Sequence, residues 1–395
     1  MNRNHAMALD HYDRLATYRD DYSLPETGAY LSGHSLGAMS KHTPSVINKL
    51  LTQEWGKSGV NAWFKSDWIN MPARIGAKAE KLFGALNGEI ITTDSTSVNL
   101  FKLLMCAMQL RSKRRLILTE RGNFPTDIYI AESISKILPN AEVKYCENGE
   151  LINMIDTDVA VVMVSHIDFR SGKLNDLRKL TQAAHHKGAL ILADLSHSAG
   201  VIPLSLADDE VDFAVSASYK YISGGPGSPA FLYVAQKHQK HASTPISGWM
   251  GHLVPFDFSE HYTPAHGIKK FLCGTPPILA MMALEHNLDQ LNRVSIKDIR
   301  TKNLALTDLM IELMKIHCPD MTLLTPSDHG NRGGHLAYTH QNAKTIYQKL
   351  GDAGYVCDYR PPNLLRFGLA PLYLRYIDIY DTVITLSAIL SEITS

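Results

Sequence analysis

Short apolar runs alternate with amphipathic stretches through the middle of the chain. Residues 159–164 form a continuous apolar run, the pattern of a strand buried on both faces. Residues 175–187 carry apolar positions at helical spacing, with Asn175 suited to the start and Gly188 to the end. A second apolar run follows at residues 189–193. This strand–helix–strand order predicts neighbouring parallel strands.

The same alternation continues on both sides of this unit. Further strands are predicted at residues 116–119, 212–217 and 230–234, and an amphipathic helix around 128–138. After about residue 290 the pattern changes to a long helix over 296–316, followed by short strands and helices.

These patterns predict an α/β fold with a mostly parallel central sheet flanked by helices, plus a smaller C-terminal α+β domain. We expect the large domain to cover residues 56–290 and the small domain residues 291–395. The N-terminal segment, residues 1–55, is expected to pack near the small domain.

Composition narrows the partners. The 395 residues carry 39 Lys+Arg and 39 Asp+Glu, so the formal net charge is zero, which argues against nucleic acid or a membrane surface as partner. The 5 cysteines are scattered without a CxxC pair, so neither a disulfide framework nor a metal site is expected. The first residues lack the apolar core of a signal peptide, and we expect a cytoplasmic protein.

Polar residues follow the predicted strands where a parallel sheet binds ligands, beyond its carboxyl ends. Ser165 follows the first run, Asp194 and His197 follow the second, and Tyr219-Lys220 follows the strand near 212–217. Singly, these residues are ordinary: a surface lysine, a helix cap, a core histidine. Together, a lysine able to form a Schiff base and an aspartate able to pair with a pyridinium nitrogen favour pyridoxal phosphate.

The other requirements of that cofactor have candidates. Thr96 and Ser97 lie in a hydroxyl cluster that opens an apolar helix, where a phosphate can bind, although a plain helix cap explains them equally well. Phe124 follows a predicted strand and could stack on the ring, or could belong to the core. Arg366 could bind a substrate carboxylate, or could be a surface residue.

Two motifs carry a wider resemblance. Ala193-Asp-Leu-Ser-His-Ser-Ala-Gly200 and Ser218-Tyr-Lys-Tyr-Ile-Ser-Gly-Gly-Pro-Gly227 resemble the kynureninases, pyridoxal-phosphate hydrolases of the aspartate aminotransferase fold, the transferase fold type I. Further similar blocks are Tyr-Leu-Ser-Gly-His-Ser-Leu-Gly, Asn-Phe-Pro-Thr-Asp, Gly-Trp-Met-Gly-His, Cys-Gly-Thr-Pro-Pro and Asp-Tyr-Arg, and they span nearly the whole chain.

The resemblance implies roles for individual residues. Catalysis would fall to Lys220, which links the cofactor, to Asp194 at the ring nitrogen, and to Tyr219 as acid or base. Contacts with pyridoxal 5'-phosphate are implied for Thr96, Ser97, Phe124, Asp127, Ser165, Asp194, His197, Tyr219, Lys220, Trp249 and Thr275. Thr275 would reach the neighbouring subunit, because the family forms homodimers with shared sites.

The implied reaction is hydrolytic Cβ–Cγ cleavage of L-kynurenine, a small amino-acid substrate of tryptophan degradation, to anthranilate and L-alanine. Arg366 would bind the α-carboxylate, and Ser35, His34 and Phe64 would lie near the rest of the substrate. The chain departs from the family pattern at His34, Phe64, Ala193 and Ser223. The preferred substrate therefore stays open between kynurenine, 3-hydroxykynurenine and another modified kynurenine.

Two rival functions remain. A cysteine desulfurase or selenocysteine lyase of the same fold needs a nucleophilic cysteine, and Cys357 precedes Arg366 by a short loop. A non-catalytic cofactor-binding protein is the second rival. The presence of both Lys220 and Asp194 argues against it.

Overall fold

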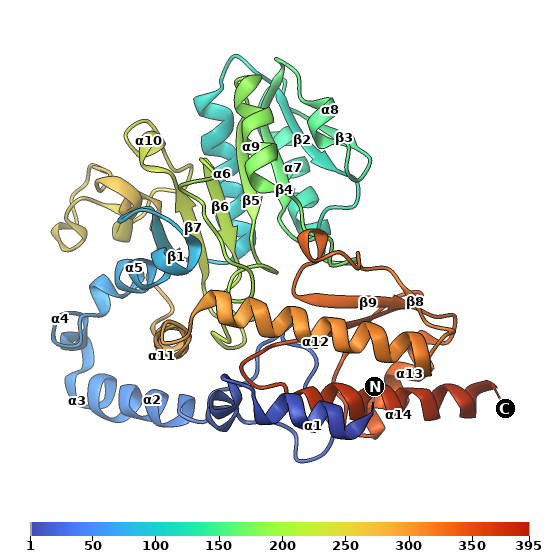
Figure 1. The fold of residues 1–395 in the computed structure, drawn as a ribbon. Coiled ribbons are helices and arrows are strands. Elements are labelled where there is room, and N and C mark those ends of the chain that lie inside the picture. Colours follow the sequence, from blue (N-terminus) through green and yellow to red (C-terminus); the bar gives the residue numbers. More distant parts are fainter. Residues whose placement is uncertain (1, 395) are drawn as a thin grey trace.

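The computed structural model describes residues 2–394, and its central feature is a 7-stranded sheet (Figure 1). The strand order is β1-β7-β6-β5-β4-β2-β3, in which β3, β2, β4, β5 and β6 run parallel. β7 is antiparallel to both of its neighbours, β1 and β6. The strands are β1 (Ile90–Thr93), β2 (Leu116–Glu120), β3 (Glu142–Cys146), β4 (Val159–Ser165), β5 (Leu190–Asp194), β6 (Phe213–Ser216) and β7 (Ala230–Val234). The mostly parallel sheet predicted from the sequence is confirmed.

Helices flank this sheet. They are α5 (Met71–Phe83), α6 (Thr96–Leu110), α7 (Pro125–Ile137), α8 (Leu151–Met154), α9 (Leu177–His186) and α10 (Gln236–Gln239). The longer ones, α5, α6, α7 and α9, each bury apolar residues. One sequence expectation was wrong: Asp176, not Asn175, caps α9, its side chain accepting from the backbone N–H of Lys179. Asn175 instead donates to the carbonyl of Ser165 at 2.9 Å.

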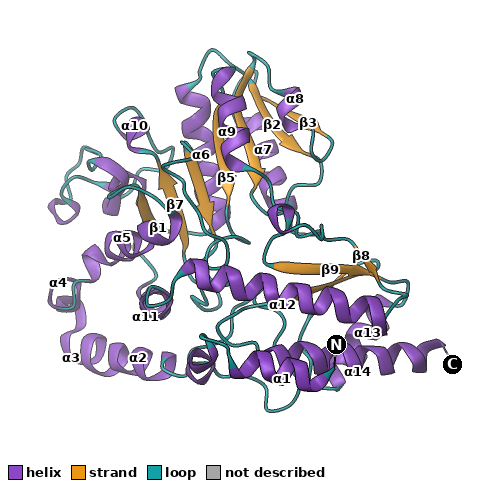
Figure 2. Ribbon diagram, in the orientation of Figure 1, coloured by secondary structure: helices purple, strands orange, loops and turns teal. Residues whose placement is uncertain are grey.

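A second, antiparallel sheet of 4 strands, in the order β10-β11-β9-β8, lies in the C-terminal part. Its strands are β8 (Thr322–Leu323), β9 (His335–Thr339), β10 (Asp358–Arg360) and β11 (Leu364–Gly368). The neighbouring helices are α11 (Ile278–Leu291), α12 (Ile296–His317), α13 (Ala343–Asp352) and α14 (Tyr376–Thr394). Figure 2 shows strands and helices mixed in this part, as the sequence predicts for an α+β domain.

The N-terminal segment lies alongside the C-terminal part of the molecule in space (Figure 1). Its helices are α1 (Arg3–His11), α2 (Thr43–Lys49), α3 (Gly56–Ser58) and α4 (Ala62–Lys65). α1 packs against α14, and α2 packs against α11. Short 3₁₀ and π turns complete the chain: η1 (Ala16–Asp21), η2 (Leu50–Trp55), η3 (Gly59–Asn61), η4 (Trp68–Asn70), η5 (Trp249–Gly251), η6 (Pro255–Asp257), η7 (Gly267–Phe271) and η8 (His329–Asn331).

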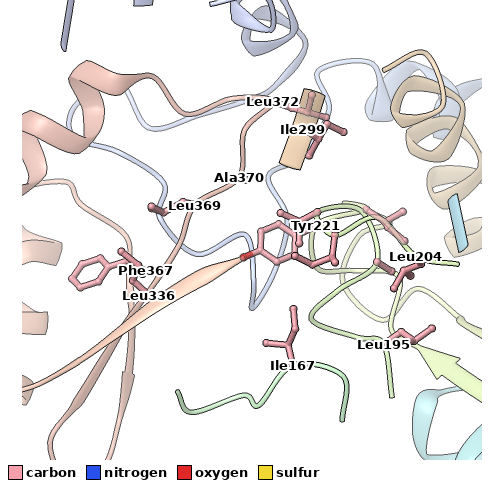
Figure 3. Close-up of a cluster of buried hydrophobic side chains, with 14 of the residues drawn as sticks. Ile167, Leu195, Leu204, Tyr221, Ile299, Leu336, Phe367, Leu369, Ala370 and Leu372 are labelled. Carbon is pink, nitrogen blue, oxygen red and sulfur yellow. The ribbon is translucent and has the colours of Figure 1, made fainter. Parts of the chain in front are cut away.

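One hydrophobic core joins the two sheets. Figure 3 shows Tyr221 among apolar side chains from both parts, including Leu195 after β5 and Phe367 of β11. The Tyr221 hydroxyl donates to the carbonyl of Gly334 at 2.8 Å, immediately before β9. Burial of this contact holds the segment after β6 against the C-terminal sheet.

Within residues 2–394, no helix combines the length and apolar character that crossing a membrane requires.

Candidate active site

A cavity of about 270 Å³ opens at the carboxyl ends of the parallel strands. Nine of the residues expected from the sequence line it: Thr96, Ser97, Phe124, Asp127, Ser165, Asp194, His197, Tyr219 and Lys220. They converge because successive parallel strands bring their carboxyl ends to the same edge of the sheet.

One end of the cavity is the start of α6. Ser95 caps the helix, accepting from the backbone N–H of Val98, and Thr96 and Ser97 form its first turn. The free N–H groups and hydroxyls of such a turn favour an anion. Behind the turn, the buried ammonium of Lys102 donates to Asp94 Oδ2 at 2.5 Å and to the carbonyl of Phe271 at 2.6 Å. This ion pair holds the residues that precede the helix.

Two carboxyl groups lie close together on another side. Asp194 ends β5, and its Oδ1 accepts from the backbone N–H of Ser196 at 2.8 Å. Asp127 is 1% exposed, and burial, followed by the charge of Asp194, raises its pKa well above the usual value. Burial thus favours the protonated form of Asp127. Asp127 Oδ2 is buried without a hydrogen-bond partner among the described residues.

The lysine and tyrosine at the end of β6 face these carboxyls. Burial lowers the pKa of Lys220 to about 8, against the opposing influence of Asp194. Burial, together with the charge of Asp194, raises the pKa of Tyr219. Near neutral pH, Tyr219 is thus a proton donor, and a fraction of Lys220 is a neutral amine. This pairing of perturbed groups is typical of catalytic sites.

Phe124 and Phe169 form an aromatic wall of the cavity. An asparagine that the sequence did not single out holds this wall in place. Asn123 Oδ1 accepts from the backbone N–H of Phe124 at 2.7 Å and from Ser165 Oγ at 2.6 Å. Phe124 meets Phe169 edge to face, with ring centroids 5.2 Å apart. Asn123 thus ties the loop after β2 to the end of β4.

Arg366 of β11 lies just behind the cavity and is 1% exposed. Its Nη1 donates to the carbonyl of Phe169 at 2.5 Å, and its Nε and Nη2 contact Asp358 Oδ1 at 3.0 and 2.9 Å. These partners use three of the five guanidinium N–H groups. One N–H on each Nη is left, which is the fork that a carboxylate accepts. Arg366 is not among the residues that line the cavity, but Phe169, whose carbonyl it contacts, is.

The remaining candidates do not line this cavity. Trp249 packs edge to face with Trp63 and Phe256, at centroid distances of 5.9 and 5.4 Å. Phe64 is 64% exposed, and Thr275 is exposed as well.

The two N-terminal candidates, Ser35 and His34, also lie away from the cavity lining. Ser35 is half-buried in a turn, its backbone N–H donating to the carbonyl of Ser32 at 2.9 Å. His34 is wholly buried beside His335. The roles of these residues in substrate binding stay predictions.

A second, larger cavity of about 620 Å³ lies elsewhere, among residues that precede β2, β3 and β4. It contains none of the candidate residues and faces the amino ends of those strands, so its size does not make it the catalytic site.

Three residues around the active-site cavity escaped the sequence analysis. Lys102 is a charged residue inside an apolar helix, and that mismatch was a usable signal. Asn123 precedes Phe124 and could have been noticed as a turn residue. Phe169 lies in an irregular loop, and no periodicity marks it.

Comparison with known proteins shows which family this chain resembles. Residues 299–386 match the family model described as the kynureninase C-terminal domain. The chain is 39% identical to the kynureninase of Pseudomonas fluorescens, covering 99% of this chain and 96% of that protein. It is 40% identical to the kynureninase of Deinococcus radiodurans, covering 98% and 96%, and 40% identical to that of Burkholderia pseudomallei, covering 98% and 95%.

Solved structures share the fold at low sequence identity. A cysteine desulfurase from Thermococcus onnurineus superposes with a TM-score of 0.80 at 15% identity, covering 95% of this chain and 97% of that one. A variant of the enzyme C-DES with glycine covalently linked to its PLP cofactor gives a TM-score of 0.81 at 16% identity, covering 92% and 97%. These likenesses confirm the predicted fold type I architecture and concern the fold alone.

Proposed function

This chain belongs to the kynureninase family, and from that premise we propose that it hydrolyses the Cβ–Cγ bond of L-kynurenine to anthranilate and L-alanine, using pyridoxal 5'-phosphate. The observation that carries the proposal is the cavity in which Lys220, Asp194 and Asp127 meet beside the start of α6. 3-Hydroxykynurenine or another modified kynurenine is the alternative substrate.

The residues present fit the cofactor. Thr96 and Ser97 would hold its phosphate at a helix N-terminus. Asp194, anchored by the backbone N–H of Ser196, would pair with the ring nitrogen. The unpartnered Asp127 Oδ2 lies buried in the same wall and would face the ring's hydroxyl side. When bound, the cofactor supplies a conjugated ring that withdraws electrons from the substrate Cα.

The protein's own groups account for the proton transfers. A neutral Lys220 amine can accept the Cα proton and later donate it at another atom. Its pKa of about 8 makes the neutral amine available near neutral pH. Tyr219, protonated, can donate to the departing carbon or orient the water that adds to the γ-carbonyl. Arg366 orients the substrate by its α-carboxylate, through the two N–H groups left free.

The desulfurase alternative lacks support from Cys357. Its side chain is 5% exposed, and burial raises its pKa to about 12. The thiolate is the nucleophile in such enzymes, and this environment disfavours it.

We further propose that the active unit is a homodimer. Aromatic side chains with large exposed fractions gather where residues 55–64 meet residues 249–258; Trp55 is 56%, Phe64 64% and Phe258 72% exposed. Phe64 contacts Phe256 across this surface, at a centroid distance of 4.9 Å. An exposed apolar patch of this kind favours burial against a second copy. Trp249 and Thr275 would then complete the partner's cavity rather than their own.

The test is direct. Purified protein supplied with pyridoxal phosphate should release fluorescent anthranilate from L-kynurenine, and kcat/KM for L-kynurenine and 3-hydroxykynurenine should rank the two substrates. Lys220→Ala should abolish release while retaining the native circular dichroism. Absence of turnover with every kynurenine tested would overturn the proposal.

A further inference from the structure

Three histidines pack together behind the cavity wall. His34 comes from the N-terminal segment, His197 follows β5, and His335 begins β9. The rings of His34 and His335 stack, with centroids 4.9 Å apart and planes 19° apart. His197 lies 5.4 Å from His335 and 6.2 Å from His34. We call His34, His197 and His335 the histidine stack; only His197 also lines the cavity.

His34 is poorly satisfied for a buried polar residue. It is 0% exposed, and neither of its ring nitrogens has a hydrogen-bond partner among the described residues. A neutral imidazole always carries one N–H, and leaving that donor unpaired in the interior is unfavourable. An apolar ring would serve a purely structural purpose better, so the position calls for another explanation.

The stack is joined to the strand that carries Arg366. The backbone N–H of Gly368 donates to the carbonyl of Leu31 at 2.7 Å, which lays the segment before His34 along β11. Gly368 also pairs with His335 in the C-terminal sheet. A Cβ added to Gly368 would overlap with His34 Nδ1, so the imidazole rests directly on this strand.

A carbonyl group makes a second connection. The carbonyl of Phe169 accepts from Arg366 Nη1, and the same carbonyl favours the protonated form of His335. The carbonyl of Phe169 is thus close to both Arg366 and His335, and of these two only Arg366 donates a hydrogen bond to it.

The charges that face His34 are all of one sign. They are Arg366 of β11 and Lys220 after β6. Burial, and after it these positive neighbours, lower the pKa of His34 well below its usual value, and burial does the same for His197 and His335. Near neutral pH the stack is therefore uncharged.

We propose that His34 is a positioning residue for substrate capture: its ring, lying on Gly368 and stacked on His335, holds the Arg366 strand and His197 in register. This inference rests on the proposed function, in which Arg366 binds the α-carboxylate. Ser35, the adjacent candidate for substrate binding, would be held in place by the same contact.

Two substitutions test the contribution of the flat ring of His34. His34→Asn removes the flat ring and should raise KM for L-kynurenine about tenfold at pH 8, with kcat changed less than about threefold. His34→Phe keeps a flat ring that cannot take a proton. It should leave KM near that of the unmodified protein at pH 8, because the ring that lies on Gly368 and His335 is kept.

The matched control is His166→Phe. His166 is also buried, with its pKa lowered to about 4, but it lies outside the stack. This control should leave KM for L-kynurenine within about twofold of the unmodified protein, because His166 does not touch the stack. Cofactor content, measured from absorbance, should be equal in all three variants.

Binding of L-alanine, followed by the absorbance of the cofactor, gives the same comparison without turnover. If L-kynurenine is not cleaved but His34→Asn still weakens L-alanine binding, the proposed function fails while the role of His34 stands. If His34→Asn lowers kcat and cofactor content as well as raising KM, the role of His34 is merely structural. A KM of His34→Phe raised as far as that of His34→Asn would overturn the role of the flat ring.

Discussion

Lys102 allows the rigidity of the phosphate end of the cavity to be measured. Its ammonium is 0% exposed and bridges Asp94, which precedes α6, to the carbonyl of Phe271, which leads toward Thr275. We predict that Lys102→Met destabilises the protein and weakens cofactor binding, because both segments lose their common partner.

The magnitude follows from burial. Removing one member of a buried ion pair costs about 3–5 kcal/mol, because the other charge is left uncompensated. Asp94 keeps the hydrogen bond from Thr93 Oγ1 and its side chain is 24% exposed, which favours the lower end of that range. The carbonyl of Phe271 loses its charged donor and adds about 1 kcal/mol. Met has nearly the same helix propensity as Lys, so we expect a total of about 4 kcal/mol.

The control is Lys78→Met on α5. Lys78 contacts Glu285 and Asp289, each at 2.8 Å, but its side chain is 30% exposed. Solvent screening limits such a pair to about 1 kcal/mol or less. Urea unfolding followed by circular dichroism, with and without pyridoxal phosphate, compares the two variants. Equal losses of unfolding free energy would refute the reasoning, because they would mean that burial does not set the strength of the Lys102 pair.

Further predictions concern substrate capture, thiol chemistry and pH. Arg366→Lys should raise KM for L-kynurenine about tenfold or more with a smaller effect on kcat, because an ammonium cannot present two parallel N–H groups; steady-state kinetics in which only kcat falls would contradict it. Cys357→Ala should leave anthranilate release within about twofold, since its thiol is buried with a raised pKa; loss of release together with sulfide production from cysteine by the unmodified protein would reverse that conclusion. Each member of the histidine stack has a lowered pKa in the folded state, so below about pH 6.5 the unfolded state binds more protons than the folded state. The unfolding free energy should therefore fall as pH falls, by up to about 1.4 kcal/mol per pH unit for each histidine. The raised pKa of Asp127 acts in the opposite sense for one proton. Urea unfolding at pH 7.5 and 5.5 measures the sum, and a free energy that did not fall would count against neutral, buried rings.

Local patterns predicted the elements of the large sheet closely. The strand at residues 230–234 has the limits read from its apolar run, and the helix expected over 296–316 extends to His317. The start of α9 was misplaced by one residue because Asn175 and Asp176 can both cap a helix. Only the tertiary structure decides between them, since it gives Asn175 another acceptor in Ser165.

For the candidate site, too, some residues could be predicted from the sequence and others could not. Residues at strand ends, such as Asp194 and Lys220, converge because parallel topology alone brings them together. The surroundings of Trp249, Phe64 and His34 depend on how loops far apart in sequence pack, and no periodicity encodes that. The burial of Lys102 illustrates the limit, because its partner, the carbonyl of Phe271, lies 169 positions away.

The position of β1 at the edge of the sheet has a consequence for synthesis of the chain. β1 pairs with β7 alone, so the strand that leads into α6 waits for a partner until residues 230–234 have been made. The segment before His34 waits longer still, because its partner strand ends at Gly368. The anion-binding turn is therefore synthesised well before the strand that holds β1 in place. A chain interrupted before β7 should thus fail to load the cofactor, and one interrupted between β7 and β11 should lack only the contacts of the segment before His34.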